Sequence, residues 1–191
     1  MSRLDELIRQ HCTDGVEYKE LGSVAEISRG IRVVKNQLSS EGKFPVYQNS
    51  LTPLGYYDKS NCKGDTSFII AAGAAGEVGF SYVDFWAADD CYYFDGHGKL
   101  ASRYLYHVLL SRNTYLKSHV RKASIPRISR QSIEKMAIPV PPLPVQEEIA
   151  RILDSFTELT AELTAELTAR RRQYEYYRDR LLTFKDGGGM Q

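Results

Sequence analysis

Basic side chains of the kind that bind phosphate groups gather in one segment of this chain. Six lysines and arginines lie between Lys117 and Lys135, where Glu134 is the one acid. Lysine, arginine, serine and backbone N–H groups all donate hydrogen bonds to phosphate oxygens. The stretch KASIPRISR at residues 122–130 therefore predicts a phosphate-binding track. Its candidate ligands are Lys122, Ser124, Arg127 and Arg130.

A second group of polar side chains lies upstream, between turn signals. Asparagine, glutamine and arginine carry the paired donors and acceptors that match base edges, and lysine supplies a point charge for phosphate. The group therefore predicts base or phosphate contacts made from loops. Each of the two groups, taken alone, also fits an ordinary solvated face, and composition does not decide between these interpretations. The members of the second group are Arg32, Lys35, Asn36, Gln48 and Asn49.

Catalytic constellations are missing from the sequence. Residues 73–79 read GAAGEVG, which has the wrong glycine spacing for a dinucleotide loop and is better explained by turns. The run GHGK at residues 96–99 lacks the upstream glycine and the Ser/Thr of a phosphate loop. The four histidines have no metal-ligand spacing, and the pair Asp89-Asp90 has no basic or metal-binding companion nearby. These patterns predict a non-catalytic protein with no metal site and no cofactor of its own.

Composition limits the classes of protein that remain. The 191 residues are 42% apolar and 26% charged, and their formal net charge is +1, so any binding of an anionic polymer must come from local patches. No apolar run approaches about 18 residues, and the N-terminal MSRLDELIRQ is too charged for a secretory signal. We therefore expect a cytoplasmic protein without membrane contact. The widely spaced Cys12, Cys62 and Cys91 predict reduced thiols.

Two regions precede the C-terminal part of the chain. Residues 1–15 predict a short helix from Ser2 to His11 that packs near the C-terminal helix, because Leu4, Leu7 and Ile8 recur at helical spacing. Residues 16–143 predict a compact α+β domain, since short β-type runs alternate with glycine-rich turns and helical patterns follow. The expected strands cover residues 24–27, 44–47, 67–72, 78–83, 91–94 and 136–140, and the expected helices cover residues 100–120 and 129–136.

One long amphipathic helix is predicted over residues 144–186, followed by a flexible tail at residues 187–191. The stretch IPVPPLP at residues 138–144 predicts a stiff, extended hinge before it, and no glycine or proline follows Pro144 until Gly187. Forty helical residues make a rod of roughly 60 Å, which is too long to bury its apolar stripe on a small domain. The stripe therefore predicts a helix–helix interface through Ile149, Phe156, Leu159, Leu163, Leu167, Tyr174, Tyr177 and Leu181.

The charges of this helix predict how two copies pair. Its middle carries the tandem Thr-Ala-Glu-Leu repeats at residues 160–163 and 164–167 and is acidic, whereas residues 170–172 are three arginines. An antiparallel pair brings Glu158 beside Arg172 of the partner subunit, whereas a parallel pair stacks the acidic block on itself. Charge therefore favours an antiparallel pair. The alternative is a solvated helix whose leucine stripe packs on its own domain.

The order of motifs resembles one half of a type I restriction-modification specificity subunit, over nearly the whole chain. The motifs are LGSVAEISRGIRV, FPVYQNS, IIAAGAAGEVGF, IPRIS, then IPVPPLPVQEEIARILD, the TAEL repeats and RRRQYEYYRDRLLTF. The resemblance implies a single DNA target recognition domain and a spacer helix that docks methyltransferase (M) subunits. The chain departs from the full-length pattern, because it stops at KDGGGMQ where a second recognition domain would begin.

The resemblance implies that the chain forms a homodimer and recognises a specific sequence of double-stranded DNA. The implied site is bipartite and two-fold symmetric. The resemblance also implies an adenine-N6 methyltransferase and a restriction (R) subunit as partners, with S-adenosylmethionine and ATP bound by those subunits. Two alternatives stay open: a non-catalytic coiled-coil adaptor whose globular domain binds protein, and a stand-alone DNA-modifying enzyme. The adaptor predicts no DNA binding, and the enzyme predicts a cofactor site that the sequence does not display.

Overall fold

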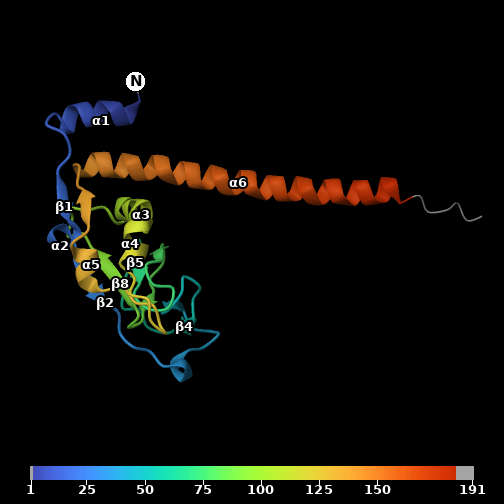
Figure 1. The fold of residues 1–191 in the computed structure, drawn as a ribbon, viewed down its shortest axis with the longest axis horizontal. Helices are drawn as coiled ribbons and strands as arrows, with labels where there is room; N and C mark the ends of the chain where they lie inside the picture. Colours follow the sequence, from blue (N-terminus) through green and yellow to red (C-terminus); the bar gives the residue numbers. More distant parts are fainter. Residues whose placement is uncertain (1, 184–191) are drawn as a thin grey trace, which may run out of the picture. The chain divides into compact units, whose positions relative to one another are not determined.

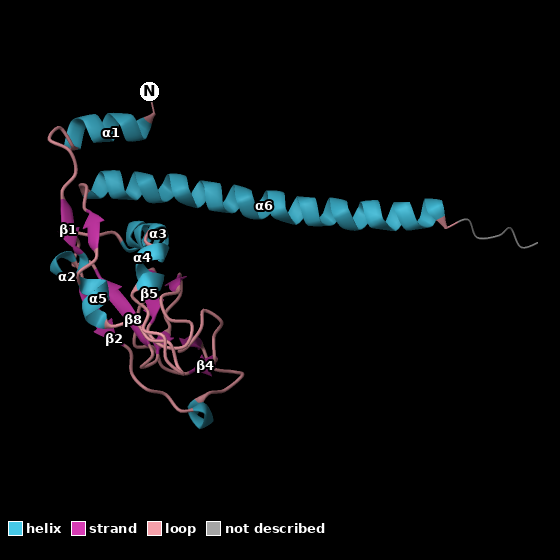
Figure 2. Ribbon diagram, viewed as in Figure 1, coloured by secondary structure: helices cyan, strands magenta, loops and turns pink. Residues whose placement is uncertain are grey.

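The computed structural model describes residues 2–183, and the chain divides into two compact units, residues 1–150 and 151–191. The first unit combines helices with three small sheets, and the described part of the second unit is helical (Figure 1; Figure 2). The predicted α+β fold with a long C-terminal helix is therefore confirmed. Within residues 2–183, no helix combines the length and apolar character that crossing a bilayer requires.

A four-stranded antiparallel sheet forms the centre of the first unit. The strand order is β2 (Glu26–Arg29), β8 (Cys91–Asp95), β5 (Thr66–Ile70) and β6 (Val78–Ser81). Strands β5 and β6 form a hairpin in which Gly79 lies opposite Phe68. A Cβ atom at Gly79 would come within 2.2 Å of the buried Phe68 ring, so any larger residue here would require that ring to shift within the core.

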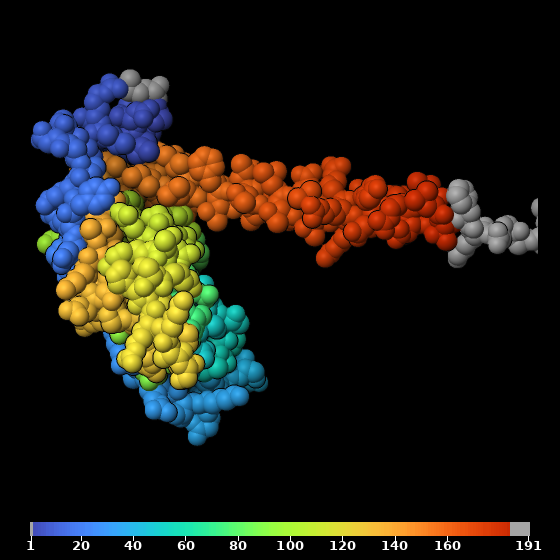
Figure 3. Space-filling view, viewed as in Figure 1, coloured from blue at the N-terminus to red at the C-terminus, as the bar shows by residue number. Residues whose placement is uncertain are grey.

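Two smaller sheets complete the first unit. Strand β3 (Phe44–Tyr47) pairs antiparallel with β4 (Gly55–Tyr57) and parallel with β7 (Trp86–Ala87). Strand β1 (Tyr18–Glu20) pairs antiparallel with β9 (Ala137–Pro139), and Figure 3 shows these blue and orange segments side by side. The sequence patterns did not predict β1, β4 or β7, because two or three residues are too few to display an alternation. The proline-rich segment that we expected to be an extended hinge thus begins in a paired strand.

The helices of the first unit are short. They are α1 (Arg3–His11), α2 (Leu21–Val24), α3 (Ser102–Ser111), α4 (Asn113–Ser118) and α5 (Arg130–Glu134), with a 3-10 turn, η1, at Lys35–Gln37.

Several expected elements were wrong in their bounds; the strands expected over residues 67–72 and 78–83, for example, end at Ile70 and Ser81. Two others depart further. The helix expected over residues 100–120 is divided at Arg112, whose N–H donates to both Val108 O and Leu109 O at 3.1 Å and so tightens the last turn of α3. The strand expected over residues 24–27 starts only at Glu26, because the preceding residues form α2. Helix α1 begins where the sequence indicates, since the Ser2 hydroxyl caps it by accepting from the Asp5 N–H at 3.2 Å.

The main core lies between α3 and the sheet. Helix α3 buries Tyr104, Leu105, Val108 and Leu109, the face that its sequence pattern predicted, in a cluster that includes Ile27 of β2. Full burial of such side chains stabilises a fold by about 1.5–3 kcal/mol each. A second cluster around Phe68 and Phe85 of the first unit supports the loops described below.

The long helix α6 spans Leu143–Leu182 and starts inside the first unit. Val145, Gln146, Glu148 and Ala150 are buried, and Ile149 is half-buried against the core, unlike the rest of the predicted stripe. From Phe156 to Leu181 the predicted interface side chains are exposed, with exposed fractions between 49% and 69%. Residues 184–191, which include the expected helix end at 186 and the expected tail at 187–191, lie outside the described residues.

Candidate nucleic-acid interface

Three loops of the first unit are joined to one another by backbone hydrogen bonds. Gly73 N–H donates to Pro126 O at 3.1 Å, and Ala74 N–H donates to Asn49 O at 2.9 Å. Ile128 N–H donates to Ala71 O at 2.9 Å. Residues more than 50 positions apart in the sequence are thereby held on one surface. This surface, formed by loops 48–50, 71–76 and 121–127, is called the loop surface below.

Two glycines shape the middle loop. Gly73 has a φ of 87° and Gly76 a φ of 83°, a region that side chains with a Cβ atom disfavour. A Cβ atom at Gly73 would also lie 2.8 Å from Asn49 O, so close contact between the loops requires glycine for a second reason. The interpretation of GAAGEVG as a set of turn glycines agrees with these observations for Gly73 and Gly76, whereas Gly79 lies inside β6.

The basic segment of the sequence contributes a small hairpin to the loop surface. Arg121 N–H donates to Arg127 O at 2.8 Å, and Arg127 N–H donates back to Arg121 O at 3.3 Å. Between these two arginines the side chains of Lys122 and Ser124 are exposed. Their donors therefore face solvent on a turn whose backbone is closed by its own hydrogen bonds, as a phosphate track requires.

Arg127 has an acidic neighbour that the sequence did not indicate. Its Nη1 lies 3.9 Å from Asp90 Oδ1, and the Asp90 side chain is only 20% exposed. The carboxylate pair Asp89-Asp90, for which we found no basic companion in the sequence, thus has one in space. Asp90 thus offsets part of the charge of Arg127 at the loop surface.

Gln48 and Asn49 are positioned by the turn that precedes β8. The Cys91 thiol contacts Tyr47 O and Gln48 O at 3.3 and 3.2 Å, and Ala88 N–H donates to Tyr47 O at 2.9 Å. Burial raises the pKa of the Cys91 thiol, so it stays protonated and acts as a hydrogen-bond donor rather than a nucleophile. Gln48 is half-buried and Asn49 is exposed.

The segment that carries Arg32, Lys35 and Asn36 is attached to the same turn. Ile31 N–H donates to Ala87 O at 2.9 Å, and the Trp86 indole N–H donates to Ile31 O at 2.8 Å. All three polar side chains are exposed, and Lys35 and Asn36 lie in η1. The stretch from Trp86 to Cys91 is therefore the common support of this segment and of the Gln48–Asn49 loop.

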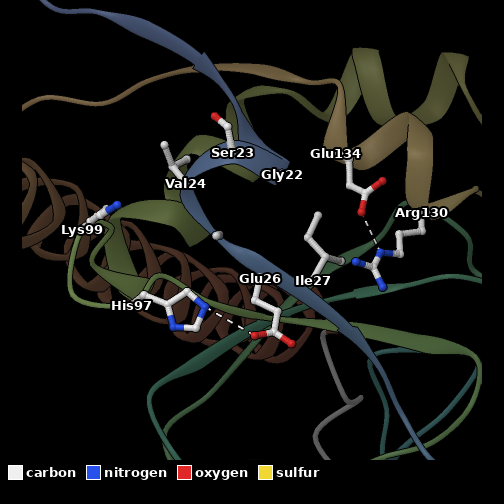
Figure 4. Close-up of a pocket in the computed structure, with 10 residues that line it drawn as sticks. Gly22, Ser23, Val24, Glu26, Ile27, His97, Lys99, Arg130 and Glu134 are labelled. Carbon is white, nitrogen blue, oxygen red and sulfur yellow. Dashed lines mark hydrogen bonds and ion pairs between the residues drawn. The ribbon is translucent and has the colours of Figure 1, made fainter.

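Arg130 lies in a different setting from the other candidates. Its Nε is 2.7 Å from Glu134 Oε1 one turn along α5, and the pair lines a pocket with α2, β2 and His97 (Figure 4). In the same pocket His97, at a φ of 44°, points its Nε2 to Glu26 Oε2 at 3.4 Å. Neither Lys122 nor Arg127 lines this pocket. If Arg130 binds a phosphate, its guanidinium therefore does so while it is also paired with the carboxylate of Glu134.

The structure adds one basic residue to the candidate DNA contacts. This residue was counted in the basic segment of the sequence but was not named as a candidate ligand. Lys117, on α4, lines a pocket of the loop surface together with Lys122 and the 73–75 loop. The one feature of the sequence that indicated Lys117 was its position at the start of the basic segment. Over residues 2–183, no group of three or more His, Cys, Asp or Glu side chains is arranged to hold a metal ion.

Comparison with protein families decides the class of this fold. The family described as type I restriction modification DNA specificity domain matches residues 13–170, which include every loop of the loop surface. The chain belongs to this family. Specificity subunits of type I restriction-modification systems are non-catalytic, in agreement with the prediction of a non-catalytic chain.

Individual specificity subunits are similar in sequence. A putative type I restriction enzyme specificity subunit of Haemophilus influenzae is 35% identical over 187 residues, covering 90% of this chain and 47% of the relative. A putative type I specificity subunit of Mycoplasma pneumoniae is 32% identical over 174 residues, covering 89% and 48%. The chain thus spans about half the length of these relatives.

Solved structures of specificity subunits share the fold. The subunit from M. genitalium matches with a TM-score of 0.70 at 19% identity, covering 90% of this chain and 47% of that structure. The subunit from Thermoanaerobacter tengcongensis matches with a TM-score of 0.63 at 18% identity, covering 80% and 40%. At these identities the likeness concerns the fold.

Proposed function

We propose that this chain is the DNA recognition subunit of a type I restriction-modification complex and directs an adenine-N6 methyltransferase to a double-stranded site. The observation that carries the proposal is the family match over residues 13–170, which covers the loop surface and most of the long helix. The convergence of three loops supports it, because loops held on a sheet present several donors to one stretch of DNA.

Within this proposal the predicted residues take different parts. Arg32, Asn49 and Arg127 are assigned to bases or phosphates, and Lys122 is assigned to phosphate, because the first three side chains form bidentate hydrogen bonds and lysine acts as a point charge. Arg130 is assigned to phosphate and must share its guanidinium with Glu134. The remaining assigned contacts are Lys35, Asn36, Gln48 and Ser124.

The same proposal includes a homodimer formed through α6. Large apolar side chains recur from Phe156 to Leu181 with at least 49% of their surface exposed, which supports a partner helix that covers them. The proposed interface consists of Phe156, Leu159, Leu163, Leu167, Tyr174, Tyr177 and Leu181, with Ile149 at its edge. An antiparallel pair places two identical recognition domains about a two-fold axis, so the expected DNA site is bipartite and symmetric.

The chemistry belongs to the partner subunits in this proposal. The methyltransferase subunits hold S-adenosylmethionine, and the restriction subunit uses ATP. This chain binds none of these cofactors, docks the M and R subunits and acts in the cytoplasm. Its contribution to catalysis is to choose the DNA site that the partners modify.

The test is to co-express the full chain with a type I methyltransferase subunit and map N6-methyladenine across the genome of the host. We expect a split, two-fold symmetric motif that disappears when the chain is left out. Deleting Thr164–Leu167 removes about 6 Å of helix, comparable with one to two base-pair steps, and is expected to shorten the unread spacer. Both half-sites are expected to stay the same.

A length-preserving variant is the matched control for the deletion. Replacing Thr164 and Glu166 by alanine keeps both the helix length and Leu167 of the proposed interface, so the spacer is expected not to change. Methylation that does not depend on the chain would contradict the recognition role and favour the protein-binding adaptor. Altered half-sites with an unchanged spacer would contradict the measuring role of α6.

A further inference from the structure

A pocket of about 300 Å³ opens on the loop surface between the 73–75 loop, α4 and the 121–127 hairpin. Its floor consists of Gly73, Ala74 and Ala75, with Val120 and Pro126 beside them. Lys117 and Lys122 complete the lining, and both side chains are exposed. Among the described residues, the seven that line this pocket include no acid.

The floor of the pocket is held in place by its own backbone. Gly73 and Ala74 donate their N–H groups to Pro126 O and Asn49 O, and Gly76 N–H donates to Ile70 O at 2.9 Å. The amides of Gly73 and Ala74 in the floor are therefore already occupied and are not free to bind an anion. The attraction for an anion comes from the two lysines, and the floor itself is apolar.

An apolar floor beside two cations fits a ligand in which apolar and anionic groups alternate. A DNA strand has it, because each deoxyribose presents carbon atoms between two phosphates. Small floor residues let such a strand approach the backbone closely, as glycine does at other phosphate sites. A free inorganic anion would leave the floor uncovered, and an apolar ligand would leave the lysines unpaired.

We propose that this pocket holds one stretch of the DNA sugar-phosphate backbone, with a deoxyribose on the 73–75 floor and the adjacent phosphates on Lys117 and Lys122. The inference rests on the proposed DNA recognition function and names a subsite within it. It makes Lys117 a DNA-binding residue. It also makes this contact independent of base sequence, because sugar and phosphate are common to all sites.

The test measures DNA affinity of the full chain with its methyltransferase subunit as a function of salt concentration. Each phosphate contact contributes about 0.9 to the slope of log K against log salt, so Lys117→Gln and Lys122→Gln should each lower the slope by about one. The loss should be equal for cognate and random duplexes. Lys19→Gln is the control, because Lys19 lies on β1 and its Nζ is 3.0 Å from Glu17 Oε2.

A neutral substitution tests the floor separately from the charges. Ala74→Gln fills part of the pocket without changing charge, so it should weaken binding to all duplexes while the salt slope stays at the wild-type value. Ala137→Gln, the same change at an exposed position on β9 outside the pocket, is its matched control and should bind as the wild type does. Circular dichroism of each variant checks that the domain is folded, and the lysine variants carry the test if Ala74→Gln unfolds.

The outcomes separate this inference from the proposed function. If the wild-type complex prefers a cognate site but Lys117→Gln and Lys122→Gln both keep the wild-type slope, the subsite is refuted and recognition stands. If the wild-type complex shows no preference for any duplex, the proposed function itself fails. A slope lowered equally by Lys19→Gln would also refute the subsite, because the loss would then reflect net charge alone.

Discussion

Replacing Gln146 by leucine should destabilise the first unit, because this side chain is fully buried and makes three hydrogen bonds. Its Oε1 accepts from Ala101 N–H at 2.8 Å, and its Nε2 donates to Lys99 O at 3.0 Å and to Pro141 O at 2.7 Å. The exposed fraction of Gln146 is 0%. The side chain thus joins the start of α6 to the loop before α3.

The expected magnitude follows from the groups that lose a partner. Leucine has a similar size but leaves one N–H and two carbonyl groups without their bonds, and each buried unsatisfied group costs about 1–3 kcal/mol. The bond to Pro141 is buried, whereas the other two are partly buried and regain some hydration. We therefore expect a loss of about 3 kcal/mol, a large part of the 5–15 kcal/mol typical of a domain.

Urea unfolding followed by the fluorescence of Trp86, the one tryptophan of the chain, measures this loss. With a slope of about 1–3 kcal/mol per molar urea, the midpoint should fall by roughly 1–3 M. Gln146→Glu should also destabilise, because a carboxylate cannot donate to the two carbonyl groups. Gln131→Leu on the exposed face of α5 is the control. A midpoint for Gln146→Leu within experimental error of the wild type would refute the reasoning.

Three further results are expected. Asp90→Asn should free the charge of Arg127 and tighten binding to random DNA several-fold at low salt, as a gel shift would show; unchanged affinity would contradict this. The hydrogen bond from the Gly64 N–H holds the pKa of Asp84 below its usual value. Ionised Asp84 therefore stabilises the fold at pH values above its pKa in the unfolded chain, and this contribution is lost as the pH falls through its pKa in the folded protein. Asp84→Asn should therefore flatten acid denaturation curves. Cys91 should resist a thiol reagent at pH 8 until urea unfolds the protein, and fast labelling would contradict its burial.

The elements with a clear local pattern were predictable from the sequence. The apolar repeat and the absence of glycine and proline located α6, and the buried face of α3 followed from helical spacing. The strand at 44–47 was predicted with its observed bounds. Very short strands were missed, and the break at Arg112 was missed because the helical pattern continues through it.

The loop surface depended on the tertiary structure. Types of residue and local periodicity indicated which side chains can bind DNA, and these are properties of single residues and their immediate neighbours. That Asp90 meets Arg127, and that Lys117 and Lys122 flank the 73–75 loop, follows from the pairing of strands and loops far apart in sequence. Local patterns contain no information about such pairings, because side-chain periods of two or 3.6 residues say which face is buried but not against what.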